Sequence, residues 1–302
     1  MTTPARAEIS RLPEYSLPDL DLPGCEKVVQ LAQNELALAP SPAAVSAAGA
    51  AVQSMNLYPE AEEGLRQAIA EVHELNPAQL LTGAGSLELM SLLTNAYCER
   101  GSEVVVSQYG YKFFQVLCTT AGATLCVVPE PDMRVDFDAI AAAVGEHTRL
   151  VFVVTPGNPT GACLPAGAVR ELRESIPARV MLIVDCAYAE FAEQQGGFES
   201  GFDLVDDGEN LVVLRTFSKA YGLAGMRVGW AYAPPDVVST IQKIRPPTST
   251  ASPSLAAAEA AMRDRDHLRL VCTEIAELRD AFSEHARSLG LRVLPRATNF
   301  VL

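Results

Sequence analysis

The sequence is poor in basic residues and lacks long apolar runs and low-complexity tracts. Its 23 Lys and Arg stand against 37 Asp and Glu, which gives a formal net charge of −14 at pH 7. No basic cluster occurs, so neither nucleic acid nor an anionic membrane surface is an expected partner. No window reaches the roughly 18 uninterrupted apolar residues of a membrane span, and residues 1–15 lack an apolar signal core. We therefore expect a cytoplasmic protein without a membrane partner.

The seven cysteines are an odd number, and none belongs to a C-x-x-C pair. Each lies alone in an apolar or helical context, which indicates reduced core thiols and not a disulfide framework. None of the four histidines lies at metal-ligand spacing, so we expect no metal. The remaining composition, 49% hydrophobic and 20% charged over 302 residues, is that of a globular chain with a sizeable core.

Short apolar runs recur from Glu103 onward. They cover residues 103–107, 124–128, 150–155, 180–185, 211–214 and 228–232. Because they are apolar throughout and do not alternate, they indicate strands buried on both faces of a mainly parallel sheet. The segments between them, for example 137–144 and 166–174, have the length and character of helices. The sequence therefore predicts an α/β fold in which helices flank a mainly parallel central sheet.

The two ends of the chain differ in character from its middle. Residues 1–33 are Pro-rich and irregular, and Ala, Leu, Arg and Glu become frequent after residue 245. The elements expected there are helices at 254–262 and 266–289, a short strand at 291–295 and the start of another at 299–302. We therefore predict a large domain over 34–245 and a smaller α+β domain built from 1–33 and 246–302.

The sequence signals of chemistry concentrate around Lys219, one of four lysines. It lies in TFSKAYGLAGMRVGW at 216–230, after an expected strand, and Arg227 follows eight positions later in a Gly-rich turn. A lone lysine is ordinarily a solvated surface group, but small and hydroxyl residues are unusual neighbours for one. The segment resembles the Schiff-base lysine segment of fold-type I, pyridoxal-phosphate-dependent aminotransferases of class I and II. Within them it is most similar to the histidinol-phosphate aminotransferase group.

Five further motifs occur in the order of that family. They are LYPE at 57–60, GAGSLE at 83–88, QYGYKFF at 108–114, TPGNPTG at 155–161 and DCAYAEF at 185–191. The similarity extends from QNE at 33–35 to NF at 299–300. It implies a homodimeric transaminase that uses pyridoxal 5'-phosphate and 2-oxoglutarate. L-Histidinol phosphate is the best-matched amino donor, which implies a role in histidine biosynthesis.

The resemblance assigns four residues to contacts with the cofactor. Lys219 forms the internal aldimine and then acts as general base. Asp185, at the end of an apolar run, keeps the pyridine nitrogen protonated, although an Asp there can also be a loop cap or metal ligand. Asn158 and Tyr188 donate to the ring oxygen, although Asn-Pro can also mark a simple turn.

The resemblance also assigns a stacking residue and a phosphate site. Tyr111 covers one face of the ring, with Tyr109 as the less favoured choice. A phosphate needs backbone amides at a helix start together with cationic and hydroxyl groups. The matched residues are Gly85, Ser86, Leu87, Thr216, Ser218 and Arg227. Tyr58 is expected to reach the phosphate of the neighbouring subunit, so that the two subunits share each site.

Several other functions stay open from the sequence. An aromatic amino acid aminotransferase, or a decarboxylase or lyase on the same fold, would keep every cofactor motif. A non-enzymatic cofactor-binding module is disfavoured, and a nicotinamide enzyme is disfavoured because GAGSLE lacks the third Gly of the dinucleotide motif. Two departures from the family also occur. Leu36–Ala39 replace the usual Asn-Pro after QNE, and Leu87 stands where many relatives have an acidic residue.

In relatives, an Arg beyond the NF strand pairs with the substrate α-carboxylate. Arg292 and Arg296 precede that point and fit the position poorly, which leaves Arg245 as the alternative. Strands at 291–295 and 299–302 would also lack partners, and uncovered apolar strand edges favour aggregation. We therefore expect the 302 residues to be a truncated chain that lacks the carboxylate clamp.

Overall fold

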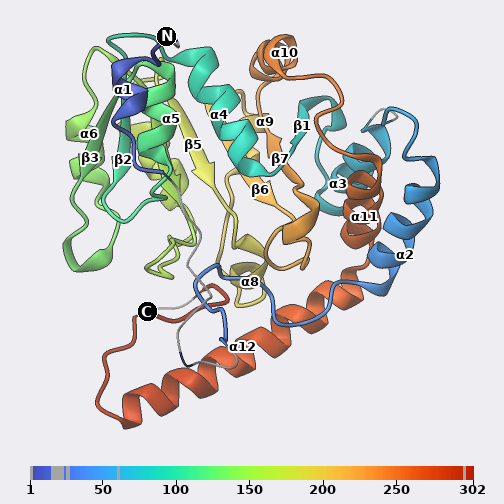
Figure 1. Cartoon of the computed structure of the whole chain (residues 1–302). Coiled ribbons are helices and arrows are strands. Elements are labelled where there is room, and N and C mark those ends of the chain that lie inside the picture. The colour runs from blue at the N-terminus through green and yellow to red at the C-terminus, as the bar shows by residue number, and fades with distance from the viewer. Residues whose placement is uncertain (1–2, 15–23, 25–27, 60–61, 295–296) are drawn as a thin grey trace.

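The computed structural model describes residues 3–14, 24, 28–59, 62–294 and 297–302, and these form a layered α/β fold (Figure 1). Their sheet has seven strands in the order β1-β7-β6-β5-β4-β2-β3. The strands are β1 Leu80–Gly83, β2 Glu103–Ser107, β3 Thr124–Val128, β4 Thr148–Val154, β5 Met181–Asp185, β6 Leu211–Thr216 and β7 Gly229–Tyr232. Neighbours from β3 to β6 pair in parallel, whereas β7 is antiparallel to both β1 and β6. The predicted mainly parallel sheet is confirmed.

Helices cover both faces of the sheet (Figure 1). The α-helices of the described residues are α1 Ala7–Ser10, α2 Pro42–Ala51, α3 Glu63–His73, α4 Ser86–Tyr97, α5 Phe114–Ala121, α6 Phe137–Ala143, α7 Ala168–Ser175, α8 Ala189–Glu193, α9 Phe202–Asp206, α10 Pro235–Ile244, α11 Ser252–Arg263 and α12 Arg265–Ser288. Side chains of a strand alternate between the two apolar layers, so that Leu182 packs in one layer and Ile183 in the other. This two-sided burial explains why the strands inside the sheet are continuous apolar runs in the sequence. The prediction of burial on both faces is wrong for β3, because it is an edge strand in which Thr124 and Val127 are exposed.

Two parts of the strand prediction are wrong. The sequence prediction omits β1, because Leu80–Gly83 is short and Thr82 is its one β-branched residue. The strands expected at 291–295 and 299–302 are not formed by the described residues of these segments. A backbone hydrogen bond from Leu294 N–H to Leu302 C=O at 2.9 Å joins the two segments, but the repeated bonds of a ladder are missing from the described residues.

Ser41 and Asp264 join the starts of two helices that are remote in sequence. The Ser41 hydroxyl caps α2 by accepting from the amides of Ala43 and Ala44, and Asp264 caps α12 by accepting from the His267 amide. Ser41 also donates to Asp264 at 2.5 Å. Helix α11 packs against α2 and α3 in the same apolar layer. The predicted domain boundaries stay a prediction.

The cysteines of the described residues are free thiols. Cys98, Cys118, Cys186 and Cys272 are buried, Cys126 is half-buried and Cys163 is exposed. The interpretation as core thiols is therefore wrong for Cys163, because it lies in the loop after β4 and not in a strand or helix. Cys25 lies outside the described residues.

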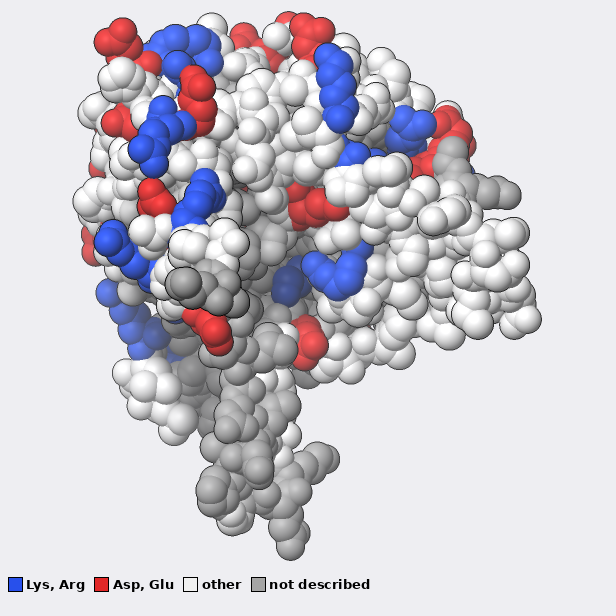
Figure 2. All heavy atoms as spheres, turned by 45° about the horizontal axis from the view of Figure 1, so that its top comes forward, with Lys and Arg blue, Asp and Glu red and all other residues white. Residues whose placement is uncertain are grey.

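Acidic and basic side chains are interspersed over much of the face shown in Figure 2. This agrees with the lack of a basic cluster in the sequence. None of the described helices has the length and apolarity needed to span a bilayer.

Candidate active site

The carboxyl ends of β4, β5 and β6 and the start of α4 surround a cavity of about 540 Å³. In open α/β sheets, ligands bind outside the carboxyl ends of the strands. The cavity is lined by ten of the residues that the sequence predicts for the site: Ser86, Leu87, Tyr111, Asn158, Asp185, Tyr188, Thr216, Ser218, Lys219 and Arg227. The fold therefore brings together motifs that are widely spaced in the chain.

Lys219 follows β6, and its amino group is held by backbone carbonyls. Its Nζ donates to the carbonyl oxygens of Gln33 at 3.0 Å and Asn34 at 3.2 Å. The same Nζ lies 5.6 Å from the centroid of the Tyr188 ring. Burial lowers the pKa of the Lys219 amino group, with Glu35 acting in the opposite direction. A lowered pKa increases the fraction of neutral amine, which is the nucleophilic and basic form.

Asp185 ends β5 and is 5% exposed. Its Oδ1 accepts a hydrogen bond from the Ala187 amide at 3.2 Å. Burial raises the pKa of the Asp185 carboxyl to about 7, although the Ala187 amide and the Lys219 charge act in the opposite direction. A cation that enters the cavity beside Asp185 would favour the ionised carboxylate and would be held by it.

Tyr188 lies between two side-chain amides. Its hydroxyl oxygen accepts from Asn34 Nδ2 and from Asn158 Nδ2, each at 3.2 Å. Burial raises the pKa of the Tyr188 phenol to about 12, so its O–H stays protonated and can donate to a ligand. The Phe300 ring packs edge-on against Tyr188 with a centroid separation of 5.3 Å, which fixes the orientation of the phenol.

Two glycines allow close packing at the start of α4, namely Gly85 at its N-cap and Gly229 of β7. A Cβ at Gly229 would lie 2.2 Å from the Ser86 amide nitrogen, and a Cβ at Gly85 would lie 2.4 Å from Arg227 Nη2. Gly85 is the N-cap of α4 with φ 86°. The first amides of a helix have no acceptor within the helix, so this terminus attracts anions.

Hydroxyl groups and a guanidinium complete a polar cup beside α4. Arg227 Nη1 donates to Ser218 Oγ at 3.1 Å and to the Ala224 carbonyl at 2.8 Å. Thr216 Oγ1 donates to Ser218 Oγ at 3.1 Å. Arg227 has φ 53° and ψ 58°, a backbone conformation that is uncommon for residues other than glycine. The polar cup formed by Thr216, Ser218, Arg227 and the start of α4 has the groups that bind phosphate.

The structure separates the two tyrosines that follow β2. Tyr111 lines the cavity, whereas Tyr109 lines a neighbouring cavity of about 370 Å³ and donates its amide to Glu130. The Tyr111 ring lies 6.2 Å from the rings of both Phe113 and Phe114. Of the two tyrosines, Tyr111 is therefore the one that borders the cavity of Lys219.

Tyr58 lies outside the cavity. It belongs to the loop between α2 and α3 and is 88% exposed. Within one chain it therefore does not join the residues that the fold brings together.

The segment at 33–35 belongs to the cavity, and the sequence prediction includes none of its three residues among the site residues. Gln33 and Glu35 line the cavity. Asn299 Nδ2 donates to the carbonyl oxygens of Asn34 at 3.1 Å and Glu35 at 3.4 Å. Further lining residues without a predicted role are Met90, Val154, Ala187, Ala224 and Gly225. The one available signal was that QNE and NF mark the two ends of the family similarity.

The arginines considered for a carboxylate clamp lie elsewhere. Arg245 forms a two-pronged ion pair with Glu62, with Nη1 at 2.8 Å from Oε2, so its guanidinium is already used. Arg292 lines a separate cavity beside Arg134. Arg296 lies outside the described residues. Among the described residues, no group of three or more His, Cys, Asp or Glu could hold a metal ion.

Residues 26–302 match the family described as aminotransferase class I and II. The chain is 40% identical over 280 residues to the histidinol-phosphate aminotransferase of Ruegeria pomeroyi. This alignment covers 92% of this chain and 77% of that protein. It is 38% identical over 303 residues to the histidinol-phosphate aminotransferase of Maricaulis maris, with 100% of this chain and 83% of that protein covered.

Solved structures show the same similarity. The histidinol-phosphate aminotransferase from Sinorhizobium meliloti, in complex with pyridoxal-5'-phosphate, has a TM-score of 0.84 and 34% identity, and the match covers 89% of this chain and 73% of that chain. An aspartate aminotransferase mutant of Thermus thermophilus has a TM-score of 0.79 at 21% identity, with 88% of this chain and 78% of that chain covered, and shares the fold.

Proposed function

The chain belongs to the class I and II aminotransferase family and is a pyridoxal-phosphate-dependent transaminase, and on this premise we propose that it transfers the amino group of L-histidinol phosphate to 2-oxoglutarate. We also propose that Lys219 carries the cofactor covalently through Nζ. The observation that carries the proposal is one cavity that contains the half-buried Lys219 amino group, the buried Asp185 carboxyl and the polar cup beside α4.

The residues around the cavity suit pyridoxal phosphate. Gly85 and Gly229 leave the start of α4 uncovered by side chains, and a Cβ at either position would clash with the polar cup. The helix amides, Ser218 and Arg227 supply donors and a positive charge for the phosphate. When bound, the cofactor supplies an electron sink that stabilises negative charge at the substrate Cα.

Four side chains orient the ring in this proposal. The Asp185 carboxyl would pair with the protonated ring nitrogen, and that positive charge would favour the ionised carboxylate against the effect of burial. The Tyr188 O–H and the Asn158 amide lie together and donate to the ring oxygen. Tyr111 covers one face of the ring.

The Lys219 amino group also moves the proton in the proposed reaction. With its Nζ free, Lys219 would take the proton from the substrate Cα and would hold it for return. Burial lowers the pKa of this group, so a larger fraction is neutral and able to accept a proton near neutral pH.

Borohydride reduction of the cofactor-loaded protein, followed by peptide mapping, tests the proposed role of Lys219. The label is expected on Lys219, and a label on Lys112 or Lys243 would contradict the proposal. The variant Lys219→Ala should still bind pyridoxal phosphate weakly through the polar cup, but lose amino transfer by about 10⁴-fold or more. The variant Lys243→Ala is the control and should keep both the label and the rate.

The choice of amino donor rests on the curated relatives, which are histidinol-phosphate aminotransferases. An aromatic amino acid donor is the second candidate, and a decarboxylase or lyase on the same fold is the third. Specificity constants for L-histidinol phosphate and L-phenylalanine, measured with and without 2-oxoglutarate, separate the three. A clear preference for phenylalanine, or product formation that is independent of the keto acid, would overturn the proposed reaction.

The protein is proposed to act as a homodimer in which Tyr58 reaches the phosphate in the neighbouring subunit. The region at the right of Figure 2, where Figure 1 places α2 and the loop after it, carries few charged side chains. The exposed residues there include Val45, Met55, Leu57 and Tyr58. Exposed apolar surface of this kind favours a protein interface.

Mixing two variants, each altered in a different contribution to the site, tests whether the site is shared. Tyr58→Phe and Lys219→Ala chains, unfolded and refolded together, should form hybrid dimers that contain one intact site and recover part of the activity. The two variants refolded separately are the control. A fully active monomer in sedimentation measurements would contradict the shared site.

A further inference from the structure

A buried ion cluster lies one residue away from the cavity. Arg215 is the penultimate residue of β6 and is fully buried. Its Nη1 donates to Glu190 Oε1 at 3.1 Å, and its Nη2 donates to Ser200 Oγ at 2.7 Å and to Glu193. We call these four residues the Arg215 cluster. None of them lines the cavity that holds Lys219.

The Arg215 cluster joins two segments that carry site residues. Arg215 directly precedes Thr216, and Lys219 follows in the same segment. Glu190 is the second residue of α8, whose N-cap is Tyr188. Side chains alternate along a strand, so Arg215 points toward α8 while Thr216 faces the polar cup. The guanidinium therefore ties the backbone that carries Lys219 to the backbone that carries Tyr188.

Stability alone does not explain this cluster. Within the described residues, Arg215 Nε and Glu190 Oε2 are buried without a hydrogen-bond partner. A buried ion pair with such unpaired atoms gains little over a well-packed apolar side chain of the same size. Arg215 also lies 5.3 Å from the Phe202 ring centroid, so an apolar residue at this position would have suitable neighbours.

We propose that Arg215 is a positioning residue for the transaminase site. It joins α8 to the end of β6 and thereby holds Tyr188 and Lys219 at the separation that cofactor binding requires. This inference rests on the roles proposed above for Tyr188 and Lys219. The planar guanidinium is essential to it, because a lysine ammonium cannot reach Glu190, Glu193 and Ser200 with the same geometry.

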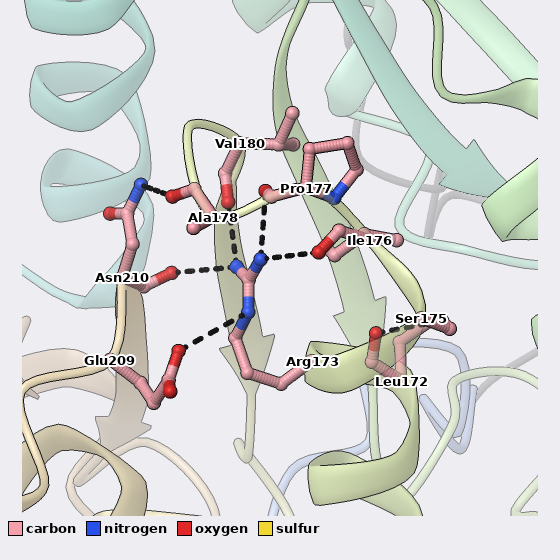
Figure 3. Close-up of polar contacts among 9 residues, drawn as sticks. All are labelled: Leu172, Arg173, Ser175, Ile176, Pro177, Ala178, Val180, Glu209 and Asn210. Atoms are coloured by element: carbon pink, nitrogen blue, oxygen red, sulfur yellow. Dashed lines mark hydrogen bonds and ion pairs between the residues drawn. The ribbon is translucent and has the colours of Figure 1, made fainter.

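Arg173 of α7 provides a matched control. It is 3% exposed, and its guanidinium is held by polar groups of the same chain (Figure 3). Its nitrogens donate to the carbonyl oxygens of Ile176, Pro177, Val180 and Asn210 and lie 3.7 Å from Glu209. Val180 and Asn210 directly precede β5 and β6, so Arg173 holds the end of these strands that is opposite to the cavity.

The test compares Arg215→Lys with Arg173→Lys by three measurements. These are thermal unfolding of the cofactor-free chain, the dissociation constant of pyridoxal phosphate, and the pH at which the visible absorption of the bound cofactor changes. Both variants should unfold at lower temperature. Arg215→Lys alone should weaken cofactor binding about tenfold or more and shift the absorption transition, because a displacement of about 1 Å is enough for such losses.

If Arg215→Lys does not fold, Ser200→Ala and Glu193→Gln each remove one contact from the cluster and test the same point. Each should weaken cofactor binding about twofold to tenfold, the range of one hydrogen bond. The proposal is overturned if these variants, or Arg215→Lys, change unfolding but leave the dissociation constant and the absorption transition as in the wild type. A borohydride label away from Lys219 in the wild-type protein would instead refute the proposed role of that lysine.

Discussion

The two ends of the strand pair β5 and β6 use their polar groups in opposite ways. At the amino ends, which we call the closed end, the donors of Arg173 are taken up by four backbone carbonyls (Figure 3). We call the carboxyl ends the open end. There Asp185 is buried beside a cavity, and the pKa of its carboxyl is raised to about 7. The closed end thus satisfies its polar groups internally, while the open end directs them toward a ligand.

This difference shows where stability and function are located in one sheet. Buried polar groups that gain a partner only when a ligand binds destabilise the cofactor-free fold, because burial of an uncompensated carboxyl or amine is unfavourable. Groups paired within the chain stabilise it or are close to neutral. Substitutions at the closed end should therefore change unfolding, and substitutions at the open end should change binding and rate.

The largest expected effect is that of Asp185→Asn at the open end. A neutral amide does not stabilise a cationic ring nitrogen, so kcat should fall on the order of 10²- to 10³-fold. Steady-state rates at saturating cofactor measure this loss. Asp207→Asn, at an exposed carboxylate, is the control and should keep the wild-type kcat. An unchanged kcat in Asp185→Asn would mean that the carboxylate has only a structural role.

The same substitution should stabilise the cofactor-free chain at high pH. The folded-state pKa of Asp185 is about 7 against an ordinary 3.8, so the folded protein keeps a proton that the unfolded chain has lost between these values. Stability from this group is therefore present below about pH 4 and is lost as the pH rises through about 7. Asp185→Asn should raise Tm clearly at pH 8 and much less at pH 5. Equal shifts at both pH values would contradict the raised pKa.

The variant Arg173→Met removes the guanidinium that holds the closed end together. Four carbonyl oxygens lose a charged donor, and we expect the free energy of unfolding to fall by about 3 kcal/mol in urea titrations. Because the change lies at the far end of the strands, cofactor affinity and kcat should stay within about twofold of the wild type. A loss of cofactor affinity as large as that of Arg215→Lys would show that the two ends are not separate.

The residues of the open end could be predicted from the sequence because they lie in motifs that resemble those of a known family, and these motifs follow apolar runs. Asp185 ends one run, Lys219 follows another and Asn158 follows a third. The resemblance assigned these residues to one cofactor, and the structure brings them to one cavity at the carboxyl ends of parallel strands. Their chemical roles stay a prediction.

The residues that support the site could not be predicted in the same way. An arginine beside an apolar run, such as Arg215, has the same sequence signal whether it is buried or exposed. Asn34 lies between the lining residues Gln33 and Glu35, and its carbonyl accepts a hydrogen bond from Asn299, which is 265 residues away in the chain. The contacts of the closed end could not be predicted from the sequence either. Arg173 bonds to backbone carbonyls, which every residue type has, so no particular residue marks its partners.

Gly229→Ala tests the packing of the open end. The new Cβ would lie 2.2 Å from the Ser86 amide nitrogen and 2.6 Å from the Gly85 carbonyl carbon, so the start of α4 must move. Overpacking of this kind costs about 1–3 kcal/mol, and cofactor affinity should fall about tenfold. Gly49→Ala, in α2 with no atom within 4 Å, is the control and should leave affinity unchanged while raising stability by up to about 1 kcal/mol.

Two asparagines give the smallest and sharpest test of the comparison. Asn210 Nδ2 donates to the Ala178 carbonyl at 3.1 Å at the closed end, and Asn158 Nδ2 donates to the Tyr188 hydroxyl at 3.2 Å at the open end. Each hydrogen bond has a net value of about 1 kcal/mol. Asn210→Ala should therefore lower the free energy of unfolding by about 1 kcal/mol and leave cofactor affinity unchanged.

Asn158→Ala should do the reverse. The Tyr188 hydroxyl keeps its hydrogen bond from Asn34, so the unfolding of the cofactor-free chain should change little. The cofactor loses one donor to its ring oxygen, and its dissociation constant should rise about fivefold. Titration of the cofactor-free chain with pyridoxal phosphate and urea unfolding of the same preparations give both quantities. If Asn158→Ala loses stability like Asn210→Ala and keeps its affinity, the open end uses its polar groups as the closed end does, and the distinction between the two ends fails.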